Sequence, residues 1–141
     1  MGSAVIRPPW DKIRNVPQLL EWWATHYGDA EALYHKNKGW WEPVTWKGYL
    51  SRVDEVVGCL RSAGVKRGDR VSILSTTRLE WVITDMAILS CGAVTTPIYQ
   101  SNTEEQCEYY ERGLTRPEID RDQCPPFLNN PCDPMDNDGY V

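Results

Sequence analysis

The feature that most constrains the fold is a β-rich run, an amphipathic stretch and a second β-rich run in direct succession. The two β-rich runs are Arg70–Leu74 and Ala93–Tyr99. Between them, residues 78–91 place apolar side chains at helical spacing, at Leu79, Val82, Ile83, Met86 and Ala87. Strands joined by a helix of this length pair in parallel with a right-handed crossover. The sequence therefore predicts a βαβ unit and an α/β fold.

Two longer helices and a hairpin are expected upstream of this unit. Residues 15–27 read as a helix capped by Asn15, and Thr45 is the expected N-cap of a helix that extends to about Ala63. Between them, residues 32–36 and 40–44 flank a Gly-containing connection typical of a β-hairpin. The first helix has an apolar stripe formed by Val16, Leu19, Leu20, Trp23, Ala24 and Tyr27. The expected inner face of the second helix consists of Trp46, Tyr49, Leu50, Val53, Val57 and Leu60.

Glycines mark the expected ends of these helices, because Gly readily adopts the left-handed conformation that stops a helix. They are Gly28, Gly64 and Gly92. The strands at 70–74 and 93–98 are expected to be apolar on both faces, like inner strands of a parallel sheet. A short helix is predicted from Thr103 to Arg112, with Thr103 and Gln106 at capping-box spacing.

The pattern changes after Gly113. Residues 113–141 contain five prolines with several Asp and Asn residues and show no helical or strand periodicity. We therefore expect an irregular or disordered tail there, and one domain over residues 1–112.

Charge and hydropathy exclude several classes of protein. The net charge is −5, with 13 basic and 14 acidic residues in 1–112 and two against six in 113–141. The balance of charges predicts no basic field that would attract nucleic acid or an anionic membrane. No signal peptide is recognisable, and no run reaches the roughly 18 apolar residues of a membrane span. We therefore expect a cytoplasmic protein with no transmembrane segment and no nucleic-acid partner.

Metal-binding patterns are weak in this sequence. The five cysteines lack zinc spacing or a tight disulfide framework, so buried or incidental thiols are expected. His26 and His35 have no partner at ligand spacing and are interpreted as surface or helix-end residues. Asp136-Asn137-Asp138-Gly139 resembles a calcium loop, but such a loop would place its first ligand at Pro134 and its twelfth beyond Val141. No metal ligand is predicted.

Other motif-like strings have structural explanations as well. Arg67-Gly68-Asp69 falls in a helix-to-strand turn, and no glycine-rich phosphate loop is present. Two tryptophan pairs, Trp22-Trp23 and Trp40-Trp41, are expected to pack at the core and its edges. A solvated helix face is the interpretation of the four glutamates Glu104, Glu105, Glu108 and Glu111. The sequence therefore predicts no catalytic residue and no cofactor-binding residue.

Several ordered blocks resemble the opening of AMP-forming long-chain fatty acyl-CoA synthetases, which belong to the adenylate-forming superfamily. Two are Gly64-Val65-Lys66-Arg67-Gly68-Asp69-Arg70-Val71 and Arg78-Leu79-Glu80-Trp81, where the family commonly reads Arg-Pro-Glu-Trp. The similarity covers about residues 13–110, and its blocks are 16–20, 27–33, 41–46, 60–75, 78–89 and 92–99. It implies that residues 1–112 are a truncated N-terminal part of an AMP-binding, acyl-CoA synthetase domain.

The resemblance also implies what this chain does not contain. In the family, ATP, Mg and CoA are handled by a phosphate loop, a metal-binding segment and a C-terminal lysine domain, none of which is recognisable here. We therefore expect an N-terminal fragment that resembles a long-chain fatty acid–CoA ligase and is inactive alone. The alternatives are a non-catalytic interaction module that docks on a full-length or split synthetase, and a small acyl-ligand-binding domain. The expected partners are the remainder of a synthetase or a second copy of the chain.

Overall fold

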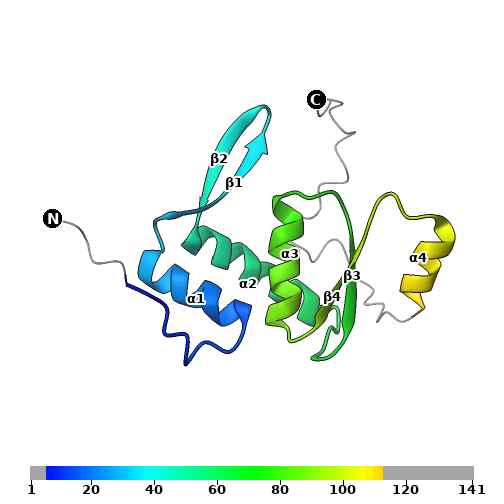
Figure 1. The fold of residues 1–141 in the computed structure, drawn as a ribbon, viewed down its shortest axis with the longest axis horizontal. Helices are drawn as coiled ribbons and strands as arrows, with labels where there is room; N and C mark the ends of the chain where they lie inside the picture. The colour runs from blue at the N-terminus through cyan, green and yellow to red at the C-terminus, as the bar shows by residue number, and fades with distance from the viewer. Residues whose placement is uncertain (1–5, 113–141) are drawn as a thin grey trace.

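A computed structural model describes residues 6–112, and the segment expected to form the irregular tail lies outside these residues. Helices and strands follow one another in a mixed α/β arrangement (Figure 1). In chain order they are α1 (Val16–Tyr27), β1 (Glu31–Asn37), β2 (Trp40–Thr45), α2 (Trp46–Ser62), β3 (Arg70–Leu74), α3 (Leu79–Ser90), β4 (Val94–Ile98) and α4 (Glu104–Glu111).

Local capping fixes where the first two long helices begin. The Asn15 side chain accepts a hydrogen bond from the Gln18 amide at 3.0 Å, and the Thr45 hydroxyl accepts one from the Gly48 amide at 3.1 Å. Each bond satisfies a backbone N–H that has no partner within its own helix. Both predicted caps are confirmed.

The strands within residues 6–112 form two separate two-stranded sheets. β1 and β2 pair antiparallel as the predicted hairpin, and β3 and β4 pair in parallel on either side of α3 in the sequence. The βαβ unit is therefore confirmed. Helix α3 lies on one face of the β3–β4 pair and α4 lies on the other (Figure 1).

The core is built around α2, which packs against both α1 and α3. Because α2 has neighbours on two sides, its buried surface is wider than the predicted stripe and includes Val56 at 1% exposure. Ile88 of α3 is fully buried although it lies off the predicted face. The buried core cluster consists of Leu20, Val44, Tyr49, Val53, Val56, Val57, Leu60, Val65, Val71, Ile73, Ile83, Ala87, Ile88 and Ala93.

One expectation about local structure needs correction. Gly28 has a φ of −51°, so it is not a left-handed stop. A side chain is excluded there because a Cβ would lie 2.6 Å from the Ala24 carbonyl oxygen. Left-handed φ values are confirmed at Gly64 (89°) and Gly92 (72°).

The two faces of the β3–β4 pair are covered unequally. In β3, Val71 and Ile73 are buried, whereas Leu74 is 61% exposed and Ser72 is only partly buried. The alternation arises because α3 covers one face of the sheet, whereas among the described residues the other face meets the short helix α4. β3 therefore carries apolar side chains on both faces, as expected, but only one of these faces is well covered.

Candidate functional site

The titratable side chains of residues 6–112 are dispersed. Within this range no three His, Cys, Asp or Glu side chains come together as a metal site would require. His26 donates through Nδ1 to the Trp22 carbonyl at 2.8 Å and stacks on the Trp22 ring at 4.2 Å. His35 lies on β1 with its Nε2 3.6 Å from a Glu42 carboxylate oxygen. Both histidines thus have structural partners.

The Arg67-Gly68-Asp69 string is a turn, as predicted. Gly68 has a φ of 88°, and its amide donates to the Gly92 carbonyl at 2.9 Å. A carboxylate oxygen of Asp69 accepts from the Lys66 amide at 2.7 Å. These bonds connect the turn after α2 to the end of α3, so the Arg67-Gly68-Asp69 string has a structural role.

The cysteines divide into two kinds. Cys91 and Cys107 are partly buried free thiols. Burial raises the pKa of the Cys91 thiol, although the Arg61 guanidinium opposes that shift, so its reactive thiolate form is disfavoured. The expectation of a thiol is wrong for Cys59, which is disulfide-bonded. Cys124 and Cys132, like the calcium-like string at residues 136–139, lie outside the described residues.

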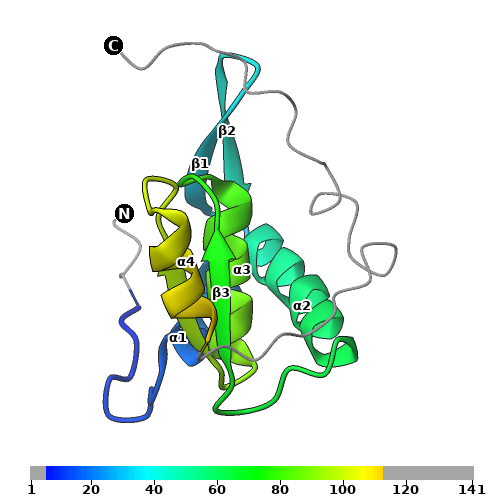
Figure 2. The same cartoon turned by 90° about the vertical axis from the view of Figure 1, so that its right-hand side faces the viewer.

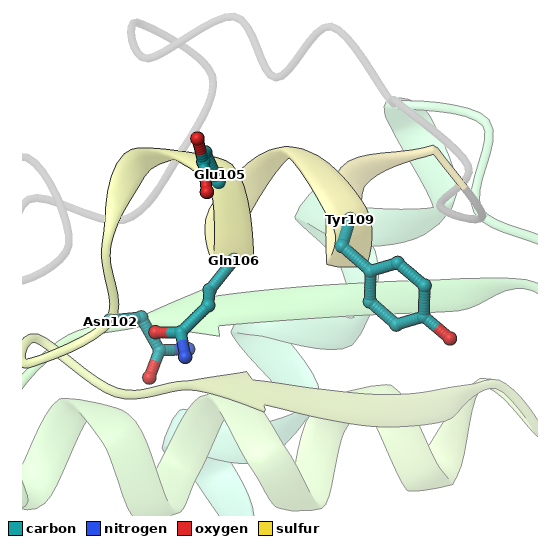
Figure 3. A pocket seen from close by; sticks show the side chains of 4 residues that line it. All are labelled: Asn102, Glu105, Gln106 and Tyr109. Carbon is teal, nitrogen blue, oxygen red and sulfur yellow. The ribbon is translucent and has the colours of Figure 1, made fainter.

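A pocket of about 250 Å³ lies beside α4 and is lined by Asn102, Glu105, Gln106 and Tyr109. Figure 3 shows Gln106 and Tyr109 extending from α4 toward the strands, whereas Glu105 points away from them. Gln106 is engaged in the predicted capping box, since its Oε1 accepts from the Thr103 amide at 2.9 Å. Three of the four lining side chains are amides or carboxylates, so this pocket does not suit an acyl tail.

The acidic residues of α4 form a solvated face where they are described. Glu104, Glu105 and Glu108 are exposed, and Glu108 forms an i,i+4 ion pair with Arg112 at 3.6 Å. The side chain of Glu111 lies outside the described part of the structure. No general acid or base is indicated by this arrangement.

The two tryptophan pairs behave differently. Trp22 and Trp23 are partly buried and meet edge to face at 5.1 Å, as expected for packing at the core edge. The same expectation is wrong for Trp40 and Trp41, which are 79% and 67% exposed. The hairpin extends past the helices, and only its base contributes a core residue, Val44 (Figures 1 and 2). Sequence spacing gives no measure of how far a hairpin projects.

Hydropathy of the helices adds one negative finding. Among residues 6–112, none of the helices has the length and apolar character needed to cross a bilayer.

Comparison with known proteins shows which family has this sequence pattern and this fold. The family model of AMP-binding enzymes matches residues 20–112. The long-chain-fatty-acid–CoA ligase FadD15 of Mycobacterium bovis is 45% identical over 71 residues, which are 50% of this chain and 12% of that ligase. The chain thus spans only a small part of the length of this curated relative. These matches confirm the predicted resemblance.

Solved structures with the same fold are more distant in sequence. The fatty acid AMP ligase of Legionella pneumophila superposes with a TM-score of 0.66 at 20% identity, over 77% of this chain and 19% of that one. The N-terminal subdomain of Klebsiella oxytoca NpsA gives a TM-score of 0.59 at 20% identity, over 66% and 23%. The predicted fold class is therefore confirmed as that of the N-terminal subdomain of adenylate-forming enzymes. Since the family model covers most of its residues, the chain belongs to the family of AMP-binding enzymes.

Proposed function

We propose that this chain supplies the N-terminal part of the fold of a long-chain fatty acid–CoA ligase and does not activate a fatty acid by itself. The parent reaction joins a fatty acid to ATP as an acyl adenylate and releases pyrophosphate. The acyl group then passes to the thiol of CoA, and AMP leaves. The match to FadD15 at 45% identity supports this class of acyl substrate.

The observation that carries the proposal is the incompleteness of the β3–β4 sheet. Within residues 6–112, each strand has a single partner, so its other edge is unpaired. On the exposed face, Leu74 and Val94 keep 61% and 52% of their surface in water. Parallel sheets are ordinarily covered on both faces and extended by further strands. The sheet therefore offers the surface on which the remainder of a ligase would pack.

Adenylate formation needs groups that this surface does not supply. Charge developing on the phosphates must be stabilised by donors or a metal ion held in fixed positions. Residues 6–112 bring no metal-ligand cluster together. The glycines with left-handed φ, at 39, 64, 68 and 92, lie in separate turns and form no phosphate cradle. We assign no residue of this range to ATP, magnesium or CoA.

Pyrophosphate exchange tests the first half of the proposal. The purified chain is expected to show no fatty-acid-dependent incorporation of labelled pyrophosphate into ATP. Exchange that requires the fatty acid and exceeds a protein-free blank would contradict it.

Complementation tests the second half. FadD15 lacking the 71 matched residues should be inactive alone and regain exchange when co-expressed with this chain. A Leu74→Lys variant, which places a charge on the exposed sheet face, should restore much less activity. The matched control is Ile6→Lys, because Ile6 is also exposed, at 54%, and lies away from the sheet. No recovery with the unmodified chain would count against docking.

A further inference from the structure

The tip of the β1–β2 hairpin, residues 36–41, is the most exposed aromatic feature among the described residues. Trp40 and Trp41 are 79% and 67% exposed. The connecting residues Lys38 and Gly39 have left-handed φ values of 46° and 88°, as a tight two-residue hairpin turn requires. In both views the hairpin extends away from the helices (Figures 1 and 2).

Strand register places the side chains of the hairpin on two faces. Lys36 pairs with Trp41 and Asn37 pairs with Trp40. Because paired residues share a face and successive residues alternate, Trp40 and Trp41 point to opposite faces. Both are nevertheless exposed, so neither face of the tip is covered by the rest of residues 6–112.

We propose that the hairpin tip docks end-on onto an anionic lipid bilayer surface, with Trp40 and Trp41 at the level of the headgroups. An indole ring combines a large apolar surface with one N–H donor, which is why tryptophan gathers at membrane interfaces. A flat protein surface can cover only one face of a hairpin. A headgroup layer surrounds an inserted tip and contacts both tryptophans at once.

The charges of the tip complement such a surface. Residues 36–41 contain Lys36 and Lys38 and no carboxylate. The nearest acidic side chain in the strand, Glu42, accepts a hydrogen bond from Asn37 at 3.0 Å and lies 3.6 Å from His35. Charges elsewhere on the chain are screened beyond about 8 Å at physiological salt. The overall net charge of −5 therefore does not describe the field at the tip.

Vesicle flotation tests this proposal, because aggregated protein does not float. The full chain is expected to float with phosphatidylcholine vesicles containing about one third phosphatidylglycerol and to bind pure phosphatidylcholine about tenfold less. A double variant Trp40→Thr and Trp41→Thr should reduce the bound fraction about tenfold. A double variant Lys36→Gln and Lys38→Gln should also reduce it about tenfold and remove most of its salt dependence.

The control is Trp10→Ala, because Trp10 is 64% exposed but lies outside the hairpin. It should float like the unmodified chain, and circular dichroism should show that all variants keep their helices. Failure of the full chain to float with the anionic vesicles would overturn the proposal, as would undiminished flotation of the double tryptophan variant. A third contradicting result would be that the unmodified chain is a lipid-free oligomer that binds no vesicles, and that the hairpin variants convert this oligomer into a monomer. The inference rests on the hairpin alone, so loss of ligase complementation leaves its outcome unaffected.

Discussion

The indole rings of Trp23 and Trp46 stack on one another, with 5.3 Å between ring centroids and 18° between ring planes. Trp23 lies in α1 and Trp46 is the first residue of α2, so this contact joins two helices that the hairpin separates in sequence. The contact continues along α1, where the Trp23 and Tyr27 rings lie 5.1 Å apart. Tyr27 in turn donates from its hydroxyl to the Ile6 carbonyl at 3.0 Å, which fixes the segment before α1.

Trp46→Ala should therefore destabilise the fold. Removing a completely buried aromatic ring lowers the free energy of unfolding by about 3–5 kcal/mol. Because Trp46 is only partly buried, we expect a loss of about 2 kcal/mol. Urea unfolding followed by circular dichroism measures the change. Trp41→Ala provides the control, because its exposed ring should change the free energy of unfolding by less than about 0.5 kcal/mol. Equal losses for the two variants would contradict a structural role for the stack.

Tyr49 gives the fold a specific dependence on alkaline pH. Burial, together with the nearby Asp85 carboxylate, raises the pKa of Tyr49 to about 12. In the unfolded chain a tyrosine ionises near pH 10, so the unfolded state loses its proton first as the pH rises. The contribution of the protonated Tyr49 hydroxyl to the stability of the fold is complete below pH 10 and is lost as the pH rises toward 12.

Between pH 10 and pH 12 the free energy of unfolding of the unmodified chain should fall by about 1–2 kcal/mol more than that of Tyr49→Phe. Below pH 10 the variant should be less stable by about 1 kcal/mol, because it loses the hydrogen bond from Tyr49 to the Val82 carbonyl. Paired urea titrations across the range measure the difference. A difference that stays constant with pH would exclude a raised pKa.

Two glycines should respond to alanine in opposite directions. At Gly92 the φ of 72° is strained for any residue with a side chain, and a Cβ would lie 3.1 Å from Arg67 Cγ. Gly92→Ala should therefore lower the free energy of unfolding by about 1–2 kcal/mol. Gly58 lies in α2 with open space where a Cβ would be, so Gly58→Ala should stabilise by about 0.5–1 kcal/mol. Thermal melts that shift in the same direction for both would refute this account.

The order and type of the elements could be predicted because local signals agree with the final packing. Asn15 and Thr45 cap helices whose apolar faces enter the core, and the strand–helix–strand order between residues 70 and 98 favours a parallel crossover. Val56 and Ile88 were missed, since their burial depends on a second neighbouring helix that no local pattern reveals. The exposure of Trp40 and Trp41 is likewise a property of how far the hairpin projects.

The functional assignment came from a different source. No cluster of chemical groups in the sequence predicted an activity, and residues 6–112 bring none together as a metal site. The family was recognisable because several weak blocks occur in a fixed order, and the match over residues 20–112 bears this out. Segments that act as scaffold preserve the pattern of packing, and the chemistry of the family cannot be read from them.

The exposed face of the β3–β4 sheet should make the isolated chain associate with itself. Leu74 and Val94 remain largely in water, and each apolar side chain left exposed forgoes about 1.5–3 kcal/mol relative to full burial. Within residues 6–112 each strand of this sheet also has one unpaired edge, which is a template for pairing with another chain. Sedimentation velocity should therefore show concentration-dependent oligomers, and a hydrophobic dye should bind to the folded chain.

Leu74→Lys should weaken both properties, because a lysine at a sheet edge resists pairing with a second edge. Ile6→Lys removes a comparably exposed apolar side chain away from the sheet and should leave the oligomers in place. If the unmodified chain is a monodisperse monomer, the sheet is covered in solution by part of the chain itself and offers no docking surface. If Leu74→Lys and Ile6→Lys dissociate the oligomers equally, association depends on general hydrophobicity and not on this face.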